Sequence, residues 1–157
     1  MTSLTEQPKN INLLADIQFK FEISDLPNTS FFVQTVNVPG INLTEQDIPR
    51  PQHLGFSRFT GVVEYEPLNI TFLIDEYLKN WIEIHDWITG KKEKYASGVL
   101  TILSSQMNPT IEFHFSGLFP TNISEISFDS TATEPTYQIA TVAFRYSKYT
   151  IKNLINT

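Results

Sequence analysis

Residues 111–120 have the sequence IEFHFSGLFP. From Ile111 to Ser116 apolar and polar side chains alternate, which is the period of a strand with one buried and one exposed face. The run Gly117-Leu118-Phe119-Pro120 that follows is turn chemistry and predicts a corner. Beyond the corner, residues 122–129 are expected to continue as an extended segment. This stretch therefore predicts a sheet that covers a core with one face and is polar on the other.

Strands of the same kind are predicted on both sides of this stretch. Residues 17–24 alternate strictly, with apolar side chains at the odd positions. Residues 31–38 form a second strand that ends at Pro39-Gly40, and the short spacing predicts that these two strands pair as an antiparallel hairpin. Further strands are expected at 68–74, 99–103 and 137–149.

One helix is predicted from Tyr77 to Ile88, because apolar residues recur there at intervals of three and four. Asp75 is a candidate N-cap with Glu76 in the first turn, and Gly90 is expected to end the helix. Strands precede and follow the helix without βαβ alternation. The predicted fold class is α+β, mainly β. We expect one domain, residues 1–157, built as an antiparallel β-sandwich or barrel with one flanking helix.

Two tryptophans, Trp81 and Trp87, lie six positions apart on this helix and therefore point to partly different faces. Either both belong to the core, or one is exposed and marks a contact surface. The helical period alone leaves both interpretations open.

Three other segments have no clear period. Residues 1–14 hold few apolar anchors and are expected to be an N-terminal arm, and residues 150–157 a C-terminal arm. Residues 44–61 are rich in proline and glycine and are predicted to be a long loop. Long loops inside a compact domain are usually functional. The side chains of this loop that we single out as candidate contact residues are Arg50, Phe56, Arg58 and Phe59.

The composition excludes several functional classes. The 157 residues include 17 acidic and 11 basic ones, a net charge of −6, whereas a free-standing nucleic-acid binder is usually basic. The absence of cysteine excludes a disulfide scaffold, a thiolate zinc site and a cysteine nucleophile. No apolar run is long enough to span a membrane, and residues 1–10 lack the apolar core of a signal peptide.

No group of residues in the sequence indicates catalysis or a metal site. His53, His85 and His114 show none of the spacings of metal ligands. His85 and Asp86 are neighbours on the predicted helix and do not face each other, and no serine elbow accompanies them. Helix capping explains Asp75 and Glu76, and the six scattered glycines form no phosphate loop. We therefore expect no catalytic residue, no metal and no cofactor.

Several segments, taken in their order along the chain, resemble a known family. The first two are Phe19-Lys20-Phe21-Glu22-Ile23 and the strand that runs from Phe32 into the corner at Pro39-Gly40. A strand then leads through Asp75-Glu76 into the helix with two tryptophans, and GLFPTNISE at 117–125 precedes Phe128-Asp129 and the last strand. In order and spacing, over roughly residues 17–150, these segments resemble the tail tube proteins of contractile-tailed, T4-like bacteriophages and their relatives.

The resemblance implies a structural protein and not an enzyme. Its subunits would form hexameric rings that stack into a tube, with sheath, baseplate and tail terminator proteins as partners. DNA would pass through the lumen without specific binding. The protein would belong to the virion after assembly in the host cytoplasm. Within the same family, the alternative is a tube-fold initiator, terminator or baseplate hub protein present in one or two rings. From another class, the alternative is a carbohydrate-binding β-sandwich that uses Tyr65, Trp87 and Phe56 as stacking platforms.

The resemblance also suggests two roles for individual residues. The loop residues Arg50, Phe56, Arg58 and Phe59 would contact the adjacent ring. The polar faces of the strands at 17–24, 31–38, 122–129 and 137–149 would include the lumen. Glu22, Glu125 and Asp129 are the candidates for its acidic lining. An acidic wall would let DNA slide, because a basic wall would hold phosphates by releasing their counterions.

Overall fold

The computed structural model describes residues 13–24, 26, 29–30, 32–48, 56–91 and 95–155, and for residues 45–48 and 56–60 it describes the backbone alone. The strands are β1 (Phe19–Ile23), β2 (Val33–Val36), β3 (Ile41–Ile48), β4 (Phe56–Tyr65), β5 (Leu68–Leu73), β6 (Ala96–Leu103), β7 (Pro109–Ile123), β8 (Ile139–Arg145) and β9 (Lys148–Asn153). Helix α2 (Lys79–Ile88) lies between β5 and β6 in the chain.

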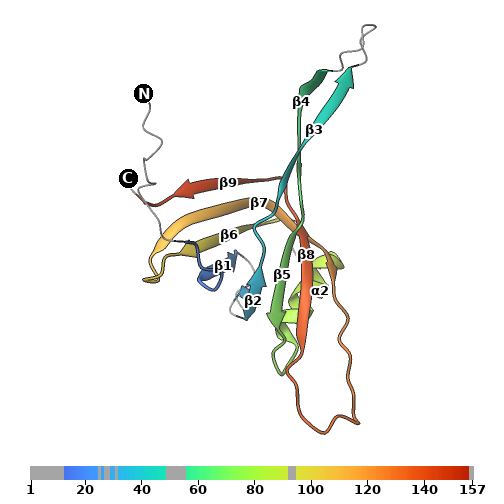
Figure 1. The fold of residues 1–157 in the computed structure, drawn as a ribbon. Helices are drawn as coiled ribbons and strands as arrows, with labels where there is room; N and C mark the ends of the chain where they lie inside the picture. The colour runs from blue at the N-terminus through green and yellow to red at the C-terminus, as the bar shows by residue number, and fades with distance from the viewer. Residues whose placement is uncertain are drawn as a thin grey trace.

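Most strands belong to one continuous sheet in the order β1-β6-β7-β8-β5-β2, to which β9 adds by pairing with β7. Strands β3 and β4 form a separate two-stranded ribbon. All of these pairings are antiparallel. In Figure 1, β6, β7 and β9 run roughly horizontally, whereas β5 and β8 run roughly vertically. The predicted class, mainly antiparallel β with a helix, is confirmed.

Strand β7 joins two parts of this sheet. One part contains β1, β6 and β9, and the other contains β8, β5 and β2. Its first part pairs with β6 and β9, and residues 119–123 pair with β8 instead. The change of partner occurs at Gly117, whose φ of 67° is a conformation that favours glycine. The predicted corner is therefore present, although the strand continues through it. Of the extended segment expected at 122–129, only residues 122 and 123 belong to the strand, which ends at Ile123. Residues 124–138 then connect β7 to β8.

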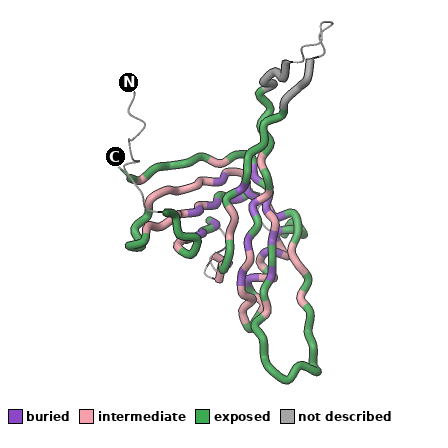
Figure 2. The backbone as a smooth tube through the Cα atoms, viewed as in Figure 1, coloured by how far each residue is buried: buried purple, intermediate pink, exposed green. Residues whose placement is uncertain are grey.

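The core lies where the two parts of the sheet face helix α2, and Figure 2 shows its buried positions along β5 to β8 and α2. On β5 the burial alternates, so that Leu68, Ile70 and Phe72 are buried while Asn69 is exposed. On β1 the burial alternates as predicted for 17–24, with Phe21 and Ile23 buried and Lys20 and Glu22 exposed, so the sheet has two distinct faces. Burying one such side chain contributes roughly 1.5–3 kcal/mol, which makes this face the main source of stability. Other large core side chains are Leu100, Phe115, Phe144, Ile84 and Trp87.

Helix α2 begins later than predicted and has a different cap. Its N-cap is Leu78, at φ 55° with no side-chain capping hydrogen bond, so the expectation that Asp75 caps the helix is wrong. The amide of Asn80 replaces the cap, because its Oδ1 accepts hydrogen bonds from Trp81 N (2.9 Å) and Asp75 N (3.3 Å). Gly90 ends the helix as predicted, at φ 83°, with its N–H donated to Trp87 O at 3.1 Å.

Both tryptophans of α2 contact the protein interior. Trp87 is 7% exposed and lies 5.9 Å from the ring of Phe144. Trp81 is half-buried, stacks on His85 at 5.5 Å and donates its indole N–H to Ser124 O at 3.3 Å. The interpretation that places both in or against the core fits better than an exposed contact platform.

The predicted hairpin between residues 17–24 and 31–38 is wrong. Strand β1 pairs with β6, and β2 pairs with β5. A cleft of about 620 Å³, lined by residues of both strands, separates β1 from β2. Ser30, in the connection between the two strands, binds back to the end of β1, because its hydroxyl accepts a hydrogen bond from Ile23 N (3.0 Å) and donates one to Leu26 O (2.9 Å).

Two further boundaries differ from prediction near the C-terminus. The single strand expected at 137–149 is divided at Tyr146-Ser147 into β8 and β9. The division follows from β7, because β8 and β9 pair with it on opposite sides of Gly117. Residues 150–153 belong to β9, so the expectation of an arm at 150–157 is wrong for them. Of the predicted N-terminal arm, residues 1–12 lie outside the described residues.

Candidate assembly surfaces

Strands β3 and β4 form an arm that projects away from the rest of the molecule (Figure 1). Their register runs from Ile41 opposite Tyr65 to Ile48 opposite Phe56, with an irregularity between Thr44 and Glu45. The loop predicted at 44–61 is therefore wrong for 44–48 and 56–61, which belong to strands β3 and β4, while 49–55 lie outside the described residues. The alternation Ile41-Asn42-Leu43-Thr44 is the sequence signal that could have revealed the arm.

The described base of the arm has one apolar face. Cross-strand partners share a face, so Leu43 and Val63 lie together on the same side as Ile41. These three side chains are 44%, 45% and 52% exposed. The opposite face carries Asn42, Glu64, Thr44 and Val62. A two-stranded ribbon is only marginally stable by itself, so a half-exposed apolar face on it is suited to contact with another subunit.

An aromatic cluster fixes the arm to the body. Tyr65, at the end of β4, lies 5.7 Å from the ring of Tyr146 and 5.5 Å from that of Tyr149. The Tyr146 hydroxyl donates to Glu66 O at 2.8 Å, and the Tyr149 hydroxyl donates to Pro39 O at 3.4 Å. Burial, helped by the neighbouring Tyr149 and Tyr65, raises the pKa of Tyr146 to about 12. These contacts hold both strands where they leave the sheet, which fixes the direction of the arm.

The predicted stacking residues lie on the outer part of the arm. Phe56, Arg58 and Phe59 are on β4, with backbones opposite Ile48, Gln46 and Glu45. The structure describes the backbone of these three residues but not their side chains. Arg50 lies outside the described residues. Their role in stacking stays a prediction.

The sheet ends at strands with one free side. Among the described residues, β1 pairs only with β6, β2 only with β5, and β9 only with β7. Free strand edges are templates for pairing with another chain. On β1, Lys20 and Glu22 form an exposed ion pair at 2.8 Å, and such charges limit indiscriminate pairing.

The structure does not bring the three predicted lumen residues onto one face. Glu22 is exposed on β1, whereas Glu125 and Asp129 are exposed in the 124–138 segment, which reaches away from β1 in Figure 1. Asp129 accepts hydrogen bonds from the hydroxyl and backbone N–H of Thr131, and these hold the pKa of its carboxyl below the usual value. The role of Glu22, Glu125 and Asp129 as the lining of a channel stays a prediction.

The structure gives little support to a sugar-binding or metal site. Trp87 is buried and Tyr65 is half-buried within the aromatic cluster, so neither is an open stacking platform. Among the described residues no group of three or more His, Asp or Glu side chains converges as a metal site requires. His85 Nδ1 lies 3.3 Å from Asp86 Oδ1, so the expectation that these two side chains do not face each other is wrong. His114 Nε2 lies 2.9 Å from Glu112 Oε2. In the part of the chain that is described, no helix has the length and apolar character needed to cross a bilayer.

Comparison with known proteins shows which proteins have a similar sequence or fold. No family model matches the sequence. The tail tube terminator protein of Enterobacteria phage T4 is 28% identical over 133 residues, covering 76% of this chain and 76% of the relative. The tube-terminating cap of the anti-feeding prophage is 15% identical and superposes with a TM-score of 0.70 over 98% of this chain and 99% of the other.

The chain has the tube fold.

The resemblance to contractile-tail tube proteins is therefore confirmed at the level of fold. A second solved structure, the baseplate of the anti-feeding prophage, contains a chain that this tube-fold protein matches equally well. The two chains superpose with a TM-score of 0.70 and are 13% identical, over 91% of this chain and 97% of the baseplate chain. Because cap and baseplate proteins superpose to the same degree, the fold alone does not specify a position along a tail.

Proposed function

We propose that this protein is the tail tube terminator of a contractile bacteriophage tail. The observation that carries the proposal is the 28% identity to the T4 protein of that name over 133 residues. The sequence segments between 17 and 150 favour a repeating tube subunit, with a terminator as the alternative, whereas this similarity favours the terminator. In this role the protein closes the tube after its last ring.

A ring is the assembly that suits the exposed surfaces. We propose hexamers in which the free edges of β1, β2 and β9 are covered by neighbouring subunits, since closure removes edges that invite uncontrolled pairing. The arm, with its apolar face of Ile41, Leu43 and Val63, then contacts the tube ring below. The proposed partners are the tube and the sheath, and the proposed location is the tail of the virion after assembly in the host cytoplasm.

The proposed cargo is DNA, which passes through the ring without specific binding. The net charge of −6 supports passage without retention, because binding of a polyanion relies on basic groups that release its counterions. We assign the protein a structural role without catalysis.

The experiment that tests the terminator role adds the purified, tagged protein to tubes polymerised from the tube protein of the same phage. Negative-stain microscopy with gold label is expected to show label at a single tube end, the end distal to the baseplate, and arrested growth there. Label along the whole length would identify a repeating tube subunit. Label at the baseplate end would identify an initiator.

A further inference from the structure

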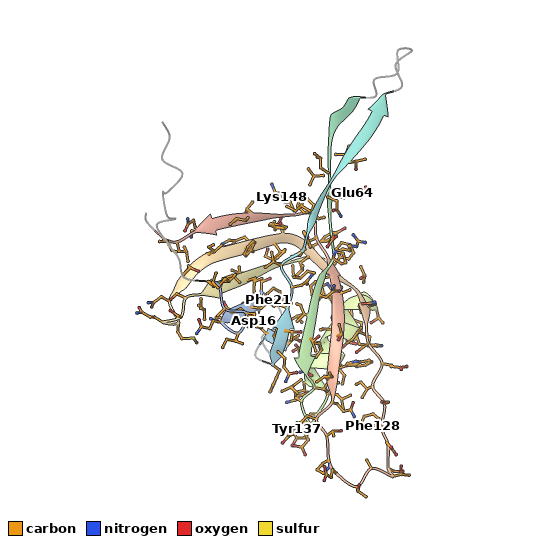
Figure 3. The ribbon with its side chains drawn as sticks, in the orientation of Figure 1. Asp16, Phe21, Glu64, Phe128, Tyr137 and Lys148 are labelled. Atoms are coloured by element: carbon orange, nitrogen blue, oxygen red, sulfur yellow. The ribbon has the colours of Figure 1, made fainter. Side chains whose placement is uncertain are left out.

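A second surface lies at the end of the molecule opposite the arm. It is a groove of about 610 Å³ between the turn at 74–78 and the 124–138 segment. Its apolar lining includes Ile74, Leu78, Ile126, Phe128 and Tyr137. Figure 3 shows Phe128 and Tyr137 at this end and Glu64 towards the arm. A groove of this size accommodates one or two side chains of a partner.

Hydrogen bonds hold the walls of the groove together. Ile74 N donates to Gln138 O at 2.9 Å, and Gln138 Nε2 donates to Ser127 O at 3.0 Å. At the start of the segment, Ser124 N donates to Thr141 O and Thr141 N to Ser124 Oγ, both at 2.9 Å. The groove is therefore formed before a partner arrives, which lowers the entropy cost of docking.

The aromatic side chains of the groove are open to solvent. Phe128 is 78% exposed and Tyr137 is 91% exposed, although the core of this protein buries many other aromatic rings. Aromatic side chains that stand together on a surface, beside a half-buried apolar floor, are typical of the centre of a protein interface.

The charge of this end is strongly negative. Residues 74–79 and 124–138 contain five acids and one base, Lys79, a net charge of −4 out of −6 for the whole chain. No lysine, arginine or histidine occurs in 124–138. The buried Oδ1 of Asp75, a residue that lines the groove, has no hydrogen-bond partner among the described residues. The negative charge of this carboxylate is therefore not offset by a hydrogen bond to Oδ1, and it adds to the potential that attracts a cationic side chain to this end.

We propose that this groove docks a basic segment of another protein of the tail, a stretch with lysine or arginine side chains and one aromatic or aliphatic anchor. The anchor enters between Phe128 and Tyr137, and the cations meet Asp75 and Glu76. This docking role is separate from tube termination, because the groove lies at the end of the molecule away from the arm and would serve at any position in the tail. DNA and anionic lipid are disfavoured occupants, since both carry the same charge sign as the groove.

The test uses a short acetylated peptide with several lysines and a single phenylalanine as the probe, titrated into the full-length ¹⁵N-labelled protein. Amide shifts are expected at 74–78 and 124–138. The variant Asp75→Asn, Glu76→Gln should weaken binding about fivefold or more, and Phe128→Ser, Tyr137→Ser by a similar factor. The control Glu22→Gln, Glu64→Gln makes the same change in net charge outside the groove and should change the affinity less than about twofold.

Several outcomes would overturn the proposal. They are the absence of groove shifts at millimolar peptide, equal weakening by the control variant, and equal affinity for a matched peptide with serine in place of phenylalanine. Self-association that Phe128→Ser abolishes would assign the groove to a second copy instead. Circular dichroism melting of each variant separates a lost surface from a lost fold. These results are independent of the tube-end labelling experiment.

Discussion

Asn80 is the residue that connects helix α2 to the sheet, and its side chain is completely buried. Its Nδ2 donates to Leu73 O at 2.7 Å, while its Oδ1 accepts from Trp81 N and Asp75 N. A hydrophobic helix stripe would place an apolar residue at such a position. The amide instead satisfies backbone groups at the end of β5 and at the start of the helix, where no N-cap side chain does so.

We predict that Asn80→Leu lowers the free energy of unfolding by about 3–5 kcal/mol, because it leaves the carbonyl of Leu73 and two backbone N–H groups without partners. Asn42→Leu, at an exposed position on the arm, is the control and should change it by less than about 1 kcal/mol. Urea denaturation followed by fluorescence measures both. A loss below 1 kcal/mol for Asn80→Leu would show that water or a shifted backbone replaces the amide.

The second prediction at this scale concerns Tyr146, whose pKa burial raises from 10.0 to about 12. The unfolded chain loses this proton near pH 10 and the folded protein only near pH 12. The stability that the neutral phenol contributes is therefore complete below pH 10 and is lost as the pH rises towards 12. Tyr146→Phe has no proton to lose, but it removes the hydrogen bond to Glu66 O.

Urea denaturation at pH 8 and pH 11 distinguishes the two proteins. Tyr146→Phe should be less stable than wild type at pH 8, by about 1 kcal/mol, and the difference should shrink or change sign at pH 11. Absorbance of the phenolate gives the titration directly. An unchanged difference between the two pH values would mean that Tyr146 ionises normally in the folded protein.

At the scale of elements, the β3–β4 arm is exposed and only its base is tied to the body. Its strands pair with no third strand among the described residues, and the aromatic cluster at Tyr65 sets its direction. The arm can therefore lose surface side chains at little cost to folding, while any partner that covers its apolar face loses buried area.

We predict that Leu43→Ser, Val63→Ser leaves the monomer folded, because both side chains are almost half exposed, but weakens ring formation or binding to tubes. Removing about 2 kcal/mol of apolar burial corresponds to a loss of roughly thirtyfold in affinity. Asn42→Ser, Glu64→Gln on the opposite face is the matched control. Sedimentation velocity and co-pelleting with tubes provide the measurements. Loss of assembly in the control alone would place the contact on the polar face.

At the scale of the whole molecule, charge is unevenly distributed between the sheet and the groove end, and a ring would repeat that pattern around its axis. Glu22, Glu125 and Asp129 are exposed, so replacing them by lysine should cost little stability. The triple replacement changes the net charge of the chain from −6 to 0.

If these residues line the channel, assembled rings of the triple lysine variant should retain DNA, and the affinity should fall steeply as salt rises. The control Glu64→Lys, Glu76→Lys, Glu134→Lys has the same net charge and alters other exposed positions. Fluorescence anisotropy with labelled DNA at low and physiological salt compares the two. Equal retention by both variants would remove Glu22, Glu125 and Asp129 from the channel wall.

Patterns that act over a few residues determined much of what could be predicted. Alternation in 17–24 and 111–116 indicated strands, and in β1 the burial follows that alternation side chain by side chain. The corner at Gly117 and the helix end at Gly90 followed from the freedom of glycine at positive φ. These features depend on local backbone geometry, which the neighbouring residues specify.

The sequence by itself determined the mainly β class, the helix and the two-faced strands, and the resemblance that it carries pointed to the tube fold. Only the tertiary structure decided which strands pair, because a period of two defines a face but not a partner. It joined β1 to β6, made an arm of residues read as a loop, and brought the turn at 74–78 beside the 124–138 segment to form the groove. It also buried Asn80, whose polar side chain is favourable there only because backbone groups distant in sequence converge on it. Such contacts depend on the summed packing of the whole chain, which no short stretch of sequence specifies.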